Sequence, residues 1–148
     1  MEHSSKLLRH FSDLEVYRDA FALGIHVFQL SRQFPAEERY ALTDQIRRSS
    51  RSVGANIAEA WGKRRYEAHF VSKLSDADAE LHECEHWLAC ATKHRYLTDE
   101  EFARLRDRIA SIGRRLGAMM RTPKPFLLRA VVATAAIPDK NPNPSPQS

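Results

Sequence analysis

The sequence predicts an all-α protein that folds as an antiparallel up-down-up-down four-helix bundle. Its 148 residues include only five glycines, and no proline lies between Ala36 and Thr122. Apolar residues recur along this stretch at the three-or-four-residue spacing of helices that bury one face. Four such segments joined by short connections pack as antiparallel neighbours. We therefore expect a bundle at residues 12–121, a polar lead-in at residues 1–11 and a proline-rich, disordered tail at residues 122–148.

The first helix is expected to begin at Ser12, because Ser12 and Glu15 have the spacing of a capping box. It should end at Phe34-Pro35, since the residue before a proline disfavours the helical conformation. Its apolar stripe comprises Val16, Ala20, Leu23, Val27 and Leu30.

The second helix is predicted from Pro35 to about Arg65, with a proline at its start and acidic residues in its first turn. Its core face comprises Leu42, Ile46, Ser49, Ser50, Val53, Ile57, Ala60 and Trp61. A second line has no bulky side chain and lets a neighbouring backbone approach closely; it comprises Ser50, Gly54, Ala58 and Gly62. This small-residue line is expected to contact either another helix of the bundle or another subunit.

The third and fourth helices carry the clearest heptad patterns. The third should end near Arg95 and Tyr96, and its seam comprises Phe70, Leu74, Ala77, Leu81, Cys84, Leu88 and Ala91. The fourth is expected to start with a capping box at Thr98 and Glu101 and to stop at Thr122-Pro123. Its seam comprises Phe102, Leu105, Ile109, Ile112, Leu116 and Met119.

Positive charge is clustered on the second helix, and this clustering points to an acidic partner better than the net charge of +4 does. One cluster should share a patch of helix surface and comprises Arg47, Arg48 and Arg51. A second cluster at the helix end comprises Lys63, Arg64 and Arg65. Contacts with phosphates by charge are expected, with little sequence preference, because only Trp61 and Tyr66 lie nearby to stack on bases.

Other polar residues are interpreted as structural. Asn56 and Glu59 share a helix edge beside the core, where they can bond a neighbouring helix and fix its register; ligand binding is the alternative. His82 and His86 match the H-E-x-x-H pattern of zinc proteases. Because Cys84 occupies a core position, both histidines should point to solvent, and neither a catalytic nor a metal site is expected there. A metal held between subunits is the alternative.

The composition argues against a membrane or secreted protein. Two cysteines in 148 residues and an N-terminus without an apolar signal segment indicate reduced thiols and a cytoplasmic location. No apolar run approaches the roughly 20 residues of a membrane-spanning helix. We expect no cofactor and no enzymatic activity.

One block of the sequence points to a family: Gln45-Ile46-Arg47-Arg48, then Ser52-Val53 and Asn56-Ile57-Ala58-Glu59. Further matches are Phe11, Leu14, Val16, Tyr17, Phe34, Pro35, Glu38 and Leu42, with weaker ones at Gly62, Glu80, Leu81, Tyr96 and Leu97. Over about residues 11–121 the chain resembles the bacterial four-helix-bundle family of 23S rRNA intervening-sequence proteins, which includes the accessory variability proteins of diversity-generating retroelements. The chain departs from the family where Ala60 replaces a usual glycine and Lys63 a usual arginine.

The resemblance implies a homo-oligomer, a pentameric barrel, without known catalysis. Retroelement members of the family bind nucleic acid and a reverse transcriptase through a basic surface. We therefore expect a non-enzymatic nucleic-acid-binding accessory protein whose phosphate contacts are the two basic clusters of the second helix. The alternative is a protein-interaction scaffold that docks a partner such as a reverse transcriptase without binding nucleic acid by itself. The sequence leaves RNA, DNA and hybrid ligands open.

Overall fold

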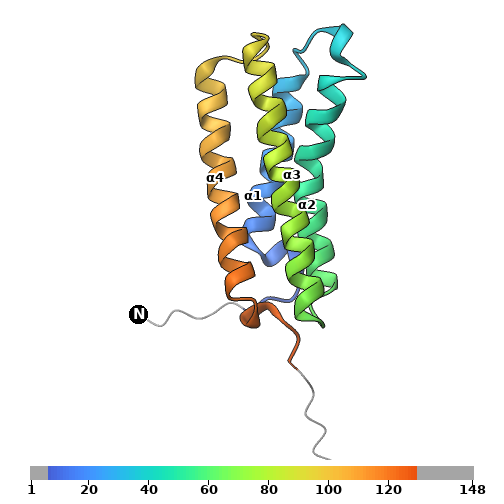
Figure 1. Ribbon diagram of the computed structural model, residues 1–148, viewed down its shortest axis with the longest axis vertical. Coiled ribbons are helices and arrows are strands. Elements are labelled where there is room, and N and C mark those ends of the chain that lie inside the picture. Colours follow the sequence, from blue (N-terminus) through green and yellow to red (C-terminus); the bar gives the residue numbers. More distant parts are fainter. Residues whose placement is uncertain (1–6, 130–148) are drawn as a thin grey trace, which may run out of the picture.

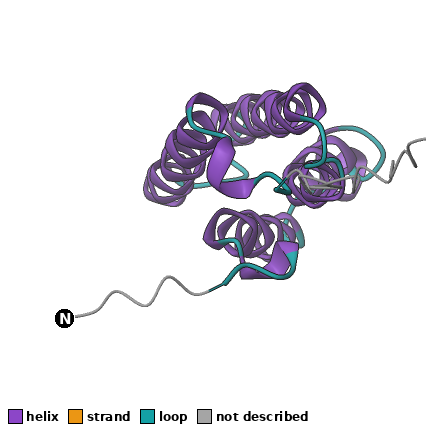
Figure 2. Cartoon of the chain, turned by 90° about the horizontal axis from the view of Figure 1, so that it is seen from below, coloured by secondary structure: helices purple, strands orange, loops and turns teal. Residues whose placement is uncertain are grey.

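The computed structural model describes residues 7–129, which form a bundle of four long antiparallel helices (Figure 1). The long helices are α1 (Glu15–Ser31), α2 (Leu42–Gly62), α3 (Glu67–Lys93) and α4 (Asp99–Arg121). Three short 3-10 helices accompany them: η1 (Phe11–Asp13), η2 (Ala36–Glu38) and η3 (Lys124–Phe126). The end-on view contains only helices and loops, and no strand occurs in the described part of the chain (Figure 2). The predicted all-α four-helix bundle is confirmed.

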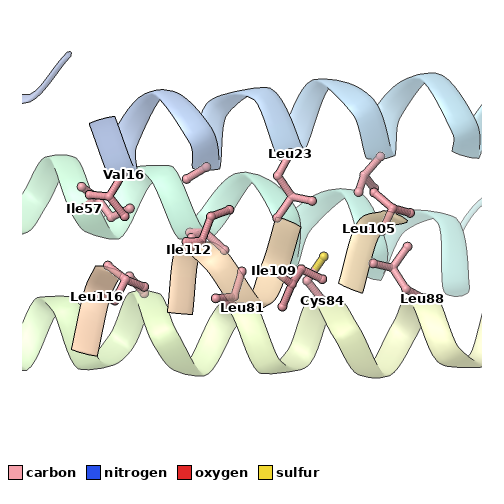
Figure 3. Packing of buried hydrophobic residues seen from close by; sticks show 14 of the residues in the cluster. Val16, Leu23, Ile57, Leu81, Cys84, Leu88, Leu105, Ile109, Ile112 and Leu116 are labelled. Carbon is pink, nitrogen blue, oxygen red and sulfur yellow. The ribbon is translucent and has the colours of Figure 1, made fainter. Parts of the chain in front are cut away.

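A single hydrophobic core runs along the bundle, with side chains from all four helices pointing inward (Figure 3). The predicted seam of α3 is buried along its whole length, from Phe70 to Ala91. The stripe of α2 is also buried, and that of α4 is buried except for the half-buried Phe102. Burying one large apolar side chain contributes about 1.5–3 kcal/mol. The heptad patterns therefore determine which face of each helix turns inward.

The start of α1 differs from the prediction of a capping box at Ser12 and Glu15. The side chain of Ser12 pairs instead with the ring of His10 (Oγ to Nδ1, 2.7 Å), and the carboxylate of Asp13 accepts the His10 N–H at 3.0 Å. These bonds close the short η1 helix, and α1 begins after the extended, buried Leu14 without a side-chain cap.

The second helix is shorter at both ends than predicted. Only η2 forms after Pro35, and at the start of α2 the Glu38 carboxylate accepts the Leu42 N–H at 3.1 Å. The same carboxylate accepts a hydrogen bond from the Tyr96 hydroxyl at 3.3 Å, which ties this connection to that between α3 and α4. At the other end α2 stops at Gly62, and the following basic residues lie in the turn to α3.

The connection from α3 to α4 is a tight one. Arg95 has a φ of 64°, a left-handed conformation that usually falls to glycine at a helix end, and α3 stops at Lys93. The predicted capping box that starts α4 is confirmed. Thr98 Oγ1 accepts the Glu101 N–H at 3.1 Å, and Glu101 Oε1 accepts the Thr98 N–H at 3.0 Å.

Both ends of the described chain lie at the end of the bundle opposite the α1–α2 connection (Figure 1). After α4, Phe126 of η3 stacks on Phe70 with ring centroids 6.2 Å apart, and the Leu128 N–H donates to the Arg64 carbonyl at 3.2 Å. Residues 122–129 therefore contact the bundle, where a disordered tail was expected. The predictions for residues 1–6 and 130–148 lie outside the described residues.

Candidate nucleic-acid interface

Arginines of α2 converge with one from α1 on a single aromatic ring. The guanidinium carbons of Arg47 and Arg51 lie 4.8 and 5.7 Å from the centroid of the Phe28 ring. That of Arg32, at the end of α1, lies 6.0 Å from the same centroid. A ring face attracts cations, so Phe28 offsets part of the repulsion among these charges. We call this arrangement the arginine platform.

Arg47 is held in place by a hydrogen bond as well as by the ring. Its Nε donates to Ser31 Oγ at 2.7 Å, and the buried Ser31 hydroxyl donates to the Phe28 carbonyl at 3.0 Å. Neither Arg47 nor Arg51 forms an ion pair with a carboxylate among residues 7–129. The positive charge of the platform is therefore ordered and uncompensated.

Arg48 lies about 100° around α2 from Arg47, and its guanidinium turns toward α3. Its guanidinium forms ion pairs with Glu83 and, at 3.4 Å, with Glu80. The hydrogen bond from Arg48 holds the pKa of the Glu83 carboxyl below its usual value, and the bond from Trp87 acts in the same direction. The expected cluster of three arginines is thus divided into two unpaired charges and one that acids compensate.

A shallow depression of about 560 Å³ crosses the start of α2. Its lining comprises Arg39, Tyr40, Thr43, Asp44, Arg47, Arg48, Arg51, Ser52 and Ala55. We call it the basic depression, because it adjoins four guanidinium groups and one carboxylate. The Thr43 hydroxyl is buried and has no hydrogen-bond partner in the described part of the chain.

Arg39 and Tyr40 were missed by the sequence analysis, which placed both inside a continuous second helix. In the structure they lie in the connection between η2 and α2, and Tyr40 is 88% exposed. The Arg39 guanidinium carbon lies 5.7 Å from the Tyr40 ring centroid. An arginine directly before a tyrosine, close behind Pro35, was the signal that could have found them.

The second basic cluster is a separate patch. Lys63, Arg64 and Arg65 follow the last residue of α2, about 18 Å along the helix axis from Arg51 at 1.5 Å per residue. Arg64 is fixed by Trp61, whose ring centroid is 3.9 Å from the guanidinium carbon and whose carbonyl accepts from Nη1 at 2.9 Å. Lys63 and Arg65 are exposed.

The small-residue line serves two purposes in the structure. Ser50 lies at a close crossing with α1, where a Cβ added to Gly24 would lie 3.7 Å from the Ser50 carbonyl oxygen. Gly54 and Ala58 instead lie in a groove of about 550 Å³ between α1 and α2. We call this hollow the apolar groove; it is lined by Tyr17, Ala20, Phe21, Gly24, Ile25, Phe28, Arg51, Gly54, Ala55 and Ala58. No atom lies within 4 Å of a Cβ built at Gly62.

The two residues expected to fix helix register behave differently. Asn56 Nδ2 donates to the Ser52 carbonyl of its own helix at 2.9 Å, so this bond does not reach a neighbouring helix. Glu59 reaches α3, where its carboxylate accepts from Lys73 Nζ at 2.7 Å. That hydrogen bond lowers the pKa of the Glu59 carboxyl.

The histidine pair of α3 points outward. His82 and His86 are both exposed, and His82 Nδ1 lies 2.8 Å from the Asp78 carbonyl oxygen of its own helix. Cys84 between them is buried, and burial raises the pKa of its thiol to about 12. Within residues 7–129 no three histidine, cysteine or acidic side chains gather as a metal site, and no helix is long and apolar enough to span a membrane.

Comparison with known proteins places the chain in a family. The sequence model of the family described as 23S rRNA-intervening sequence protein matches residues 12–118. The chain belongs to this family. One solved relative is a protein of unknown function from the S23 ribosomal protein family of Bacteroides thetaiotaomicron. It is 28% identical, and the alignment covers 72% of this chain and 99% of that one with a TM-score of 0.66. No curated protein matches the chain.

The family match distinguishes the part of the chain that the family shares from the segment that follows it. The basic depression, the apolar groove and the turn after α2 all lie within residues 12–118, whereas η3 lies beyond them. The surfaces described above therefore belong to the part of the chain that the family shares.

Proposed function

We propose that this intervening-sequence protein is a non-enzymatic accessory protein that binds nucleic acid with little sequence specificity. The observation that carries the proposal is the arginine platform, in which Arg47 and Arg51 are held without a carboxylate partner. Ordered guanidinium groups make charge-assisted hydrogen bonds to phosphate oxygens, and each contact releases condensed counterions. The family name, which refers to an intervening sequence in 23S rRNA, supports an association with nucleic acid.

The candidate phosphate contacts differ in how far neighbouring acids compensate their charge. Arg47 and Arg51, with Arg39 beside them, are the principal phosphate ligands in this proposal because no acid competes for them. Arg48 contributes less, since Glu80 and Glu83 already compensate its charge. The second patch, formed by Lys63, Arg64 and Arg65, would extend the contact along a longer strand.

The proposal includes self-association through the apolar groove, with a second copy of the chain as the occupant. Phe21 and Ile25 are 59% and 47% exposed at this groove, and contiguous exposed apolar surface commonly marks a protein contact. When such a contact repeats from copy to copy and the rotation between copies closes, it forms a ring, such as the pentamer implied by the family resemblance.

A ring would repeat the basic depression around an axis. Several weak phosphate contacts on one strand then act together, which raises the overall affinity without any new residue. The groove and the depression share only Arg51 and Ala55, so a neighbouring subunit would adjoin the depression without filling it.

Fluorescence anisotropy with a labelled RNA and a labelled DNA, at about 50 and 200 mM salt, tests the binding. The test variant combines Arg47→Glu and Arg51→Glu. The matched control combines Arg114→Glu and Arg121→Glu, which make the same charge change at exposed positions of α4. Wild type should bind and weaken steeply with salt. The test variant should lose about tenfold or more in affinity, and its salt dependence should be shallower by about two contacts.

Two results would contradict the proposal. Equal losses in both variants would mean that net charge, and not the arginine platform, governs binding. An assembled wild type that binds nothing at low salt would leave the alternative, a scaffold that docks a partner such as a reverse transcriptase and needs that partner to reach nucleic acid.

Self-association is tested by light scattering of Phe21→Lys beside Tyr66→Lys. Both residues are exposed aromatics, but only Phe21 lines the apolar groove. We expect Phe21→Lys to reduce the oligomer mass while Tyr66→Lys keeps it. A wild type that is already monomeric would remove this part of the proposal.

A further inference from the structure

Tyr40 is the most exposed large hydrophobic side chain of the described residues, at 88%. It belongs neither to the core nor to the apolar groove, and its one ring contact in this part of the chain is with Arg39 at 5.7 Å. A tyrosine presented in this way, beside several unpaired arginines, offers a flat face to a ligand.

The surroundings of Tyr40 fit a negatively charged ligand that also has a planar group. Arg39, Arg47 and Arg51 line the same depression and carry no carboxylate partner within residues 7–129. Thr43 also lines the depression, but its hydroxyl is buried beneath the surface and has no hydrogen-bond partner among the described residues. Asp44 is the one opposing carboxylate in the lining, and it disfavours binding of an anion alone.

Phosphate contacts alone do not distinguish a duplex from a single strand, but an aromatic platform does. A base in a duplex is already stacked and paired, so it can reach a protein ring only by leaving the helix. An unpaired base stacks on an aromatic side chain without that cost. We propose that the basic depression binds single-stranded RNA or DNA, with phosphates on its arginines and an unpaired base stacked on Tyr40.

This inference rests on the proposed function and specifies its ligand. It also replaces the expectation that only Trp61 and Tyr66 could stack on bases. Trp61 is buried and lies under Arg64, whereas Tyr66 is exposed but packs edge-on against His69, with ring centroids 5.4 Å apart.

The test compares a labelled single strand of about ten nucleotides, as RNA and as DNA, with the corresponding duplexes. The variants are Tyr40→Ala, Tyr40→Phe, which keeps the ring, and Tyr66→Ala, which removes an exposed tyrosine near the other basic patch. Wild type should bind the single strands more tightly than the duplexes. Tyr40→Ala should weaken single-strand binding about tenfold with an unchanged salt dependence, because a ring is lost but no charge. Tyr40→Phe and Tyr66→Ala should bind like wild type.

The outcomes separate this inference from the function on which it rests. Wild-type binding that Tyr40→Ala leaves unchanged, or weakens equally for duplex and single strand, would overturn base stacking and leave charge-driven binding intact. Loss of binding in Tyr40→Phe would also overturn it, since the ring is still present. A wild type that binds neither form would overturn both proposals. Circular dichroism of each variant verifies that the helices remain.

Discussion

The two sides of α2 use the same residue type in opposite ways. Toward α3, Arg48 is paired with Glu80 and Glu83, and Glu59 reaches Lys73. Toward α1, Arg47 and its neighbours lie over a ring with no acid to compensate them. Adjacent positions in sequence are about 100° apart on a helix, so two successive arginines can take different roles. Basic residues that are close in sequence should therefore be sorted by the helix face on which they lie before a function is assigned to them.

The ring beneath the platform offers the largest test of this difference. Phe28→Leu keeps an apolar side chain but removes the aromatic face that three arginines share. Cation–π contacts contribute about 0.5–1 kcal/mol each at exposed sites, so we expect nucleic-acid affinity at low salt to fall about tenfold. Anisotropy measures the loss, and urea denaturation should detect a fall of about 1–2 kcal/mol in the free energy of unfolding, because the same contacts stabilise the folded protein. Phe28→Tyr, which retains the ring, should bind like wild type; a loss there would argue for shape and against cation–π attraction.

Charge reversal at the paired arginine tests the opposite side. Arg48→Glu would place a third carboxylate beside Glu80 and Glu83, and we expect the free energy of unfolding to fall by about 1 kcal/mol. Arg51→Glu, which loses the contact with Phe28 but breaks no ion pair, should lower stability by less, about 0.5 kcal/mol. Urea denaturation of the two variants makes the comparison. Equal destabilisation would mean that the ion pairs on the α3 side are not formed in solution.

Removing the acidic partners of Arg48 should make its guanidinium available to bind phosphate. The double variant Glu80→Gln, Glu83→Gln removes both partners, and we expect affinity for a labelled strand to rise about threefold with a salt dependence steeper by about one contact. The control Glu67→Gln, Asp76→Asn makes the same charge change elsewhere on α3. A control that gains as much as the test variant would assign the effect to net charge.

The smallest predicted effect is the rate at which a thiol reagent reaches the cysteine buried between α2 and α3. Cys84 is fully buried there and its thiol has a pKa near 12, whereas Cys90 is half-buried. A thiolate is the reactive form, so a thiol reagent at pH 8 should modify Cys90 first and Cys84 only as the bundle unfolds. A Cys90→Ser variant isolates the slow reaction. Fast modification of Cys84 in folded protein would show that this side opens locally.

The sequence was sufficient for the fold because burial repeats along each helix. The apolar seam of α3 has no break. If the helix were rotated by one residue the seam would be exposed, so only one orientation of α3 buries it. The Thr98 capping box was readable for the same reason: both of its hydrogen bonds are local. Helix ends that depend on distant partners were not readable. Glu38, which caps α2 and also bonds Tyr96, is the example, since Tyr96 is 58 residues away.

The candidate interface was predicted only in part, and the reason is geometric. Helical spacing brought Arg47 and Arg51 together correctly, but it could not show that α3 presents acids to Arg48 or that α1 presents Phe28 to the others. Those contacts join residues of different helices, and a single sequence without the packing does not contain them. Tyr40 was missed because Pro35 and the acids after it fit the start of one continuous helix, and that pattern gives no sign of the break between η2 and α2.

The positions of the chain ends have a practical consequence. Residues 7 and 129 lie at the same end of the bundle, and the connection that carries Arg39 and Tyr40 lies at the other (Figure 1). A fluorophore attached at either of these two residues would lie about 30 Å away, the length of a helix of some 20 residues. Coupling the protein to a sensor chip through one of these residues would therefore leave the basic depression facing the flowing solution.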